Sequence, residues 1–181
     1  MFGRNKTDLK AVSYDNHYRL FEHYSKLVFR ARISIVTLIL LVAAFVFKIK
    51  PEPASMIELG GDVSLNIVSV ILFFTNLILN FMFWMEIGYT KRFYLVVSSV
   101  RDFVDEPPSF FSKDRFKGEA RPMYFVYGLA VFIFSFASVV YSWGTLPSWL
   151  IILLAVFNLI PVLLFITGWH NYTQIQKTFE N

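Results

Sequence analysis

The amino-acid sequence predicts an all-α protein with four transmembrane helices, arranged as two helical hairpins. The chain has 181 residues, of which 56% are hydrophobic and 19% are aromatic, a composition that a soluble domain of this length does not bury. A helix needs about 20 apolar residues to cross the hydrocarbon of a bilayer. Four runs without a charged residue approach or exceed that length: Ile33–Phe47, Val63–Met85, Pro122–Trp143 and Leu146–Trp169. We therefore treat residues 1–181 as a single membrane domain.

Positive charge sets the expected orientation of the chain. Residues 1–32 carry seven Lys and Arg residues and residues 86–121 carry seven more, whereas the loop 48–62 carries only two. Basic loops stay on the cytoplasmic side of a membrane. We therefore expect both termini, and the segment between spans two and three, to lie in the cytoplasm.

Residues 8–32 predict a helix that precedes the first span, which we expect at 33–49. An aromatic-rich stripe recurs in it every three or four positions, at Tyr14, Tyr18, Phe21, Ser25 and Val28. Because no Gly or Pro occurs between Gly3 and Pro51, this helix can run unbroken into the span. It either projects into the cytoplasm, where its stripe packs against helices between subunits, or bends and lies flat on lipid. We favour the projecting helix.

The second span is expected at 63–86, after a short outer loop broken by prolines and glycines. It continues into a cytoplasmic helix within the segment 89–121. The apolar face of that helix comprises Phe93, Val96, Val97, Val100, Phe103 and Val104. Pro107 and Pro108 end the helix, because proline removes a backbone donor and disfavours helix in the preceding residue.

Spans three and four are expected at 122–143 and 146–169, followed by a cytoplasmic tail, 170–181. Amphipathic aromatics gather near their ends, as is typical of membrane interfaces: Tyr124, Tyr127, Tyr141, Trp143, Trp149, Trp169 and Tyr172. Small residues on span three indicate close helix packing: Gly128, Ala130, Ser135, Ala137 and Ser138. In span four, Asn158 and Pro161 indicate either a gating hinge or a static kink.

A stripe of polar residues on span two is the strongest functional signal. The stripe comprises Asn66, Ser69, Asn76 and Asn80, which fall within about 80° of one another on a helical wheel. Polar groups inside hydrocarbon are costly unless they face protein or water. Two interpretations stay open: a pore or hydrated cavity lined by these residues once subunits assemble, or hydrogen-bonded contacts between helices.

Charged and catalytic residue types give weaker signals. Glu86 is the acid that abuts a long span, and we expect it to pair with Lys91 or Arg92 at the interface, with a proton or cation site as the alternative. The chain has no cysteine. Its three histidines are not spaced as metal ligands or catalytic residues are. We therefore expect no enzyme, no metal site and no cofactor.

A cytoplasmic basic face is the expected site for a lipid, a ligand or a partner. It comprises Arg19, Lys26, Arg30, Lys91 and Arg92. Anionic headgroups attract such charges at about 1 kcal/mol each, and nucleotide phosphates attract them too. We favour lipid contact and expect no sequence-specific binding of nucleic acid.

The stretch from His17 to Arg32, which runs straight into span one, resembles the beginning of SLATT-type domains. The part from Met85-Glu86 through Phe103 resembles their cytosolic helix, so the likeness covers about residues 10–105. SLATT domains are small two-span membrane effectors associated with nucleotide-signalling antiphage systems, whereas this chain adds a second hairpin, 122–169. The four-pass layout is also similar to the membrane subunit of the Kiwa defence system, which works with a cytosolic DNA-binding partner. The resemblance implies a homo-oligomer of the bacterial inner membrane, for which we expect a tetramer.

Two functions follow as expectations. The first is a channel-like effector or membrane sensor of antiviral defence, controlled through its cytoplasmic helices by a nucleotide signal or a partner protein. The second is a non-conducting scaffold that anchors a soluble partner through those helices and the acidic-proline turn at 105–108. A small transporter is disfavoured, because ionisable residues do not converge inside the spans.

Overall fold

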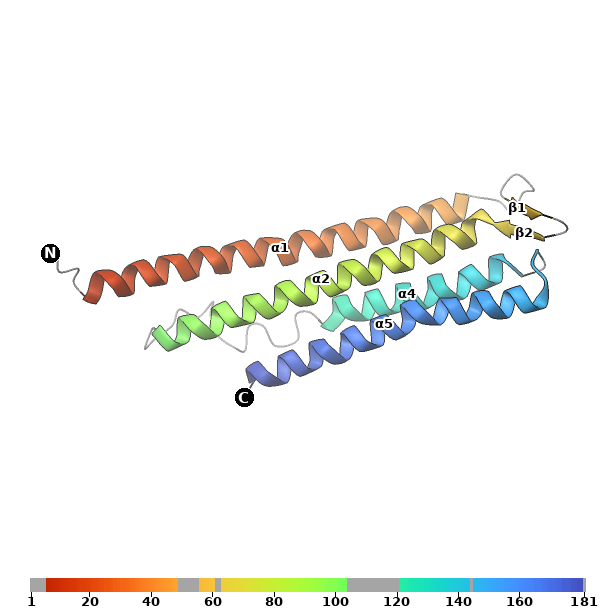
Figure 1. Cartoon of the computed structure of the whole chain (residues 1–181). Helices are drawn as coiled ribbons and strands as arrows, with labels where there is room; N and C mark the ends of the chain where they lie inside the picture. The colour runs from red at the N-terminus through yellow and green to blue at the C-terminus, as the bar shows by residue number, and fades with distance from the viewer. Residues whose placement is uncertain (1–5, 49–55, 61–62, 104–120, 144, 181) are drawn as a thin grey trace.

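A computed structural model of the chain contains four long helices and one β-hairpin in the part that it describes, residues 6–48, 56–60, 63–103, 121–143 and 145–180 (Figure 1). The helices are α1 (Lys6–Lys48), α2 (Ile67–Phe103), α4 (Arg121–Tyr141) and α5 (Ser148–Glu180). Each contains a stretch long and apolar enough to cross a membrane. The chain is thus an all-α, four-helix, multi-pass membrane protein, as its sequence predicts.

The four helices lie side by side along one long axis (Figure 1). α1 packs along α2, and α2 also contacts α4 and α5, which form a hairpin of their own. Both termini lie at one end of the molecule, here called the terminal end, and the β-hairpin lies at the other, the hairpin end.

α1 and α2 extend well beyond the start of α4 towards the terminal end (Figure 1). With 43 and 37 residues, they measure about 65 and 55 Å at 1.5 Å per residue, far more than the roughly 30 Å of a hydrocarbon core. We call the extending part, residues 14–30 of α1 and 88–103 of α2, the stalk.

An aromatic seam holds the two helices of the stalk together. Residues Phe93, Val97 and Val100 of α2 are buried under Tyr14, Phe21 and Tyr24 of α1. The rings of Phe21 and Phe93 lie 4.9 Å apart between centroids. The unbroken helix from α1 into the first span is therefore confirmed, and the aromatic stripe packs on α2 of the same chain.

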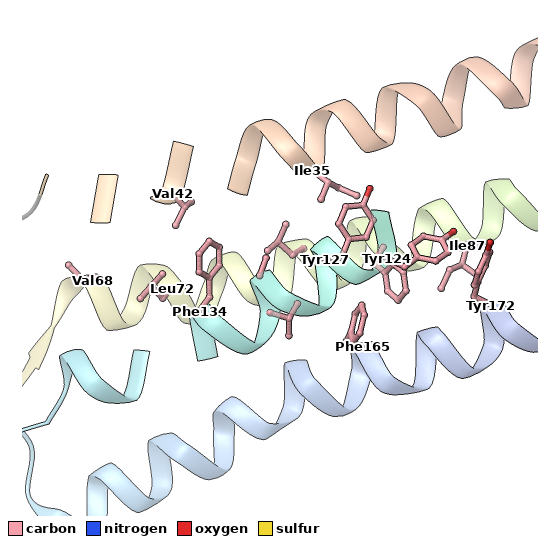
Figure 2. Packing of buried hydrophobic residues seen from close by; sticks show 14 residues of the cluster. Ile35, Val42, Val68, Leu72, Ile87, Tyr124, Tyr127, Phe134, Phe165 and Tyr172 are labelled. Carbon is pink, nitrogen blue, oxygen red and sulfur yellow. The ribbon is translucent and has the colours of Figure 1, made fainter. Parts of the chain in front are cut away.

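Apolar side chains from all four helices form the core of the bundle (Figure 2). At the hairpin end, Val68 and Leu72 of α2 are buried. Towards the terminal end, Tyr127 of α4 extends towards Ile35 of α1, and Tyr124 extends towards Tyr172 of α5, at 4.2 Å between ring centroids (Figure 2). The core thus becomes rich in tyrosine where the stalk meets the bundle.

The β-hairpin corrects one predicted boundary. Strands β1 (Met56–Gly60) and β2 (Val63–Asn66) pair antiparallel, with Met56 opposite Asn66. The prediction that span two begins at residue 63 is wrong, because α2 begins at Ile67. Asn66 sets this start, since its Oδ1 accepts a hydrogen bond of 2.9 Å from the backbone N–H of Val68, as side chains that cap helices do.

The second helical hairpin differs from its predicted bounds in length. α4 ends at Tyr141 rather than at residue 143, and α5 begins at Ser148. The predicted tail after residue 169 continues α5 as helix as far as Glu180. The acidic-proline turn at 105–108 lies outside the described residues.

Candidate functional site

Buried polar side chains form a line along the inner face of α2, on both sides of Phe83. Residues of the second helical hairpin join it, and we call the whole set the polar line: Ser69, Asn76, Asn80, Glu86 and Thr90 of α2, Ser135 and Ser138 of α4, Ser142 in the turn directly after α4, and Asn158 of α5. All nine side chains are buried inside this one chain. The line therefore lies within the bundle rather than on its outer surface.

Three serines tie α2 to α4 at the hairpin end of the line. The hydroxyl of Ser69 donates to the carbonyl of Ser138. Ser138 Oγ donates in turn to the carbonyl of Ser69 at 3.0 Å, and Ser142 Oγ donates to Ser69 Oγ at 2.7 Å. Small hydroxyls allow the two backbones to approach closely while their polar atoms stay paired.

Asn76 and Ser135 tie together three helices in the middle of the line. Asn76 Nδ2 donates to the carbonyl of Val131 at 3.2 Å and to Ser135 Oγ at 2.9 Å. Ser135 Oγ donates to the carbonyl of Asn158 at 3.4 Å. Asn80 Nδ2 donates to the carbonyl of Asn76, one turn away on its own helix, at 2.9 Å. This geometry corresponds to interhelical hydrogen bonds within one chain.

An ion pair between α1 and α2 occupies the terminal end of the line. Arg32 Nε donates to Glu86 Oε1 at 2.7 Å, and the Glu86 side chain has 0% exposure while that of Arg32 keeps 23%. The expectation that Glu86 pairs with Lys91 or Arg92 is therefore wrong. Glu86 faces inward from α2, so its charge is matched by the neighbouring helix.

Hydroxyl groups surround the buried carboxylate of Glu86. Tyr124 and Tyr127 of α4 interact with it electrostatically, and Thr90 lies one turn further along α2 and interacts with Tyr124. Elements α1, α2 and α4 thus converge on one charged group. Ionisable residues inside membrane helices are costly, and they mark functional sites in many membrane proteins.

Seven buried oxygen atoms of this region lack a hydrogen-bond partner among the described residues. They are Asn76 Oδ1, Asn80 Oδ1, Asn158 Oδ1, Glu86 Oε2, Thr90 Oγ1, Tyr124 Oη and Tyr127 Oη. An unmatched polar group costs about 1–3 kcal/mol and more in hydrocarbon. Such a set can be satisfied by bridging water or by a second packing of the helices.

The other predicted site residues lie apart from the polar line or at its margin. Asn66 caps α2, as described above, and Pro161 is buried in α5, which continues through it. Arg19 pairs with Asp15 at 3.0 Å and Lys26 pairs with Glu22 at 2.5 Å, both on the exposed surface of α1.

Three basic residues remain exposed where the stalk leaves the bundle: Arg30, Lys91 and Arg92. Within the described part of the chain, none of them belongs to an ion pair. They are therefore available to a headgroup, a ligand or a partner protein.

Sequence reasoning missed the tyrosines that face Glu86. Tyr124, Tyr127 and Tyr172 were expected at a lipid interface, but all three are buried, whereas Trp143 and Trp149 are exposed. The spacing of Tyr124 and Tyr127 carries a signal, because positions three apart share a helix face. On α4 that face continues through Val131 and Ser138, which are also buried.

Comparisons with known proteins add no relative. No protein-family model, no curated protein and no solved structure matches the chain. Within the described residues, no group of His, Cys, Asp and Glu could hold a metal ion. The fold and the site therefore define a class, that of an α-helical multi-pass membrane protein with a buried polar interior.

Proposed function

We propose that the chain is a membrane sensor and effector, which receives a cytoplasmic signal on the stalk and passes it to the bundle. The observation that carries this proposal is the buried pair of Arg32 and Glu86, which joins α1 and α2 beside Tyr124 and Tyr127 near the start of α4. A ligand or partner that binds one packing of the stalk better than another shifts the population between the two.

The surroundings of Glu86 offer its carboxylate two sets of partners. In one packing, the carboxylate binds Arg32, as described above. In the other, it binds the hydroxyls of Tyr124 and Tyr127, which already interact with it electrostatically. Buried ionic groups serve best as devices that specify one arrangement over another. Movement of α1 against α2 is the change that selects between these partners.

The resemblance stated above supplies the proposed setting. The chain then acts in the bacterial inner membrane, with both termini in the cytoplasm, as a homo-oligomer and in antiviral defence. Because the stripe on span two is buried inside one chain, the proposed oligomer, a tetramer, does not use these amides as the wall of a central pore.

Infection of bacteria that carry the chain together with its neighbouring genes tests the proposal. We expect Arg32→Met and Glu86→Gln to abolish protection against phage in plating assays, in cells whose expression is adjusted until each variant reaches the wild-type amount in the membrane. Lys26→Met, which removes an exposed ion pair on α1, should leave protection intact. Protection that survives loss of the buried pair contradicts the proposed coupling, and no protection by the wild-type chain contradicts the setting.

A non-conducting scaffold is the second candidate, favoured by three exposed basic residues, Arg30, Lys91 and Arg92. A soluble acidic partner would bind these residues and thereby stay at the membrane. Affinity purification of the full chain from membranes should then recover a stoichiometric soluble protein. Reversal of the three charges to Glu should release it, whereas Arg19→Glu on the outer face of α1 should not.

A further inference from the structure

We propose that the polar line is a route for protons through each single chain, and that Phe83 closes it. This inference rests on the proposed function, for which it supplies the output of the effector. The route runs inside one bundle of α2, α4 and α5, so it needs no pore at the axis of an oligomer.

The unpartnered oxygens fall into two groups along α2. Towards the hairpin end lie the amide oxygens of Asn76, Asn80 and Asn158. Towards the terminal end lie the carboxylate oxygen Oε2 of Glu86 and the hydroxyl oxygens of Thr90, Tyr124 and Tyr127. A buried water molecule needs two to four polar partners, and each group offers at least three. Each group thus offers enough acceptors for a water molecule, and the second group also contains hydroxyls and a carboxylate that exchange protons with it.

Phe83 separates the two groups. Asn80 and Glu86 are six residues apart on α2, which is about 9 Å along the helix, and Phe83 lies midway between them. Its side chain is fully buried at 1% exposure. The ring stacks on Phe165 of α5 at 5.0 Å between centroids and meets Tyr124 of α4 edge-on at 5.1 Å. An apolar layer from three helices therefore interrupts the polar line.

Two glycines make room for this apolar layer. A β-carbon on Gly168 of α5 would lie 2.6 Å from Phe83 Cε1, and a β-carbon on Gly128 of α4 would lie 2.8 Å from Phe165 Cε1. Contacts that short force the ring to shift. Glycine at both positions thus lets the two phenyl rings meet in the middle of the bundle, where an apolar constriction excludes water.

The chemistry of the route selects protons over metal cations. Its oxygens belong to amides, hydroxyls and one carboxylate, and that carboxylate is already paired with the guanidinium of Arg32. A metal cation that enters here finds the one carboxylate already neutralised by Arg32, and it loses its hydration shell in a packed core. Water molecules that bridge the roughly 9 Å past Phe83 pass protons from one to the next. No hydrated metal cation then has to move through the core.

Proton flux into liposomes tests the route with the purified full-length chain. Vesicles that contain a pH-sensitive dye receive a potassium gradient and valinomycin, which drives protons inward. We expect Phe83→Ala to raise the proton flux at least tenfold above the wild-type chain. Phe81→Ala removes the same ring from the outer face of α2, where Phe81 is 66% exposed, and should leave the flux unchanged.

A second substitution places the leak in the polar line. Adding Asn76→Leu to Phe83→Ala should return the flux towards the wild-type level, because it removes an amide on the route. A leak that Asn76→Leu does not reduce, or one that passes potassium as readily as protons, overturns the proposal. So does a folded Phe83→Ala chain with wild-type flux.

If the Phe83→Ala chain does not fold, Gly168→Ala tests the same apolar constriction. The added methyl group displaces the Phe83 ring and should raise the proton flux, whereas Gly88→Ala, with nothing within 4 Å of its β-carbon, should not. Equal flux in these two variants contradicts the proposal. The proton leaks expected in these variants need no signal. If the variants do not leak but protection against phage still depends on Arg32, the proton route is refuted and the sensor function stands.

Discussion

Arg32 and Glu86 are 54 positions apart in sequence, and their side chains form a hydrogen bond of 2.7 Å between α1 and α2. The pair joins two helices that also meet through apolar contacts. Removing one partner leaves the other as an uncompensated buried charge. This relationship decides both the stability of the bundle and the proposed coupling of the stalk.

The ion pair predicts a large asymmetry between single and double variants. Arg32→Met should lower the free energy of unfolding by about 3 kcal/mol, the low end for buried pairs, because the guanidinium keeps 23% exposure. Combining it with Glu86→Leu should restore most of the loss. Denaturant titration in detergent micelles measures both. Lys26→Met, at an exposed pair, should cause no measurable change, and an equal loss in this control would contradict the assignment.

The hydrogen bonds of Asn76 predict a smaller effect. Asn76→Leu removes two bonds to α4, and polar contacts between membrane helices contribute about 0.6 kcal/mol each on average. We expect a loss of about 1 kcal/mol in the same titration. Thr167→Val removes a bond within α5 on its exposed face and should not alter stability. No loss in the Asn76 variant would show that the amide does not join the helices.

The cap at Asn66 predicts a local change at the start of α2. Asn66→Ala should destabilise the first turn by about 1 kcal/mol, while Asn66→Ser should retain the cap, because serine also accepts a bond from the backbone. Hydrogen exchange of the amides at residues 67–70 measures the opening of that turn. Equal exchange rates in the two variants would argue against a capping role.

The seam of the stalk predicts opening that does not reach the bundle. Phe21→Ala removes the ring that packs on Phe93 and should speed amide exchange in residues 14–28 and 90–100. Exchange in α4 should stay unchanged, because α4 does not contribute to that seam. Phe29→Ala, at a side chain with 64% exposure, serves as the control. Faster exchange throughout the chain in the Phe21 variant would contradict a separate stalk.

The number, class and approximate placement of the helices could be predicted because they depend on local hydropathy. The same holds for the apolar face around Phe93 and Val97, which three- and four-residue spacing predicts and burial confirms. The strand at residues 63–66 could not be predicted in this way. Its four residues, Val-Ser-Leu-Asn, also suit the first turn of a span, and only pairing with β1 excludes the helix.

The candidate site was less accessible, because partners far apart in sequence form it. A helical wheel shows that Asn76 and Asn80 share a face, but it does not show which helix they face. Glu86 has basic neighbours at Lys91 and Arg92, whereas its partner lies on another helix. Tyrosine near the end of a span suits a lipid interface and a polar core equally, so the burial of Tyr124 required the fold.

The length of α1 has a mechanical consequence. From Arg32 to Lys6 the helix runs for 26 residues without a break, which is about 39 Å at 1.5 Å per residue. In the proposed coupling, a tilt of roughly 10° at Arg32 corresponds to a movement of about 7 Å at the far end of the helix. A large displacement at the end of the stalk therefore reaches the bundle as a small rearrangement around the buried pair.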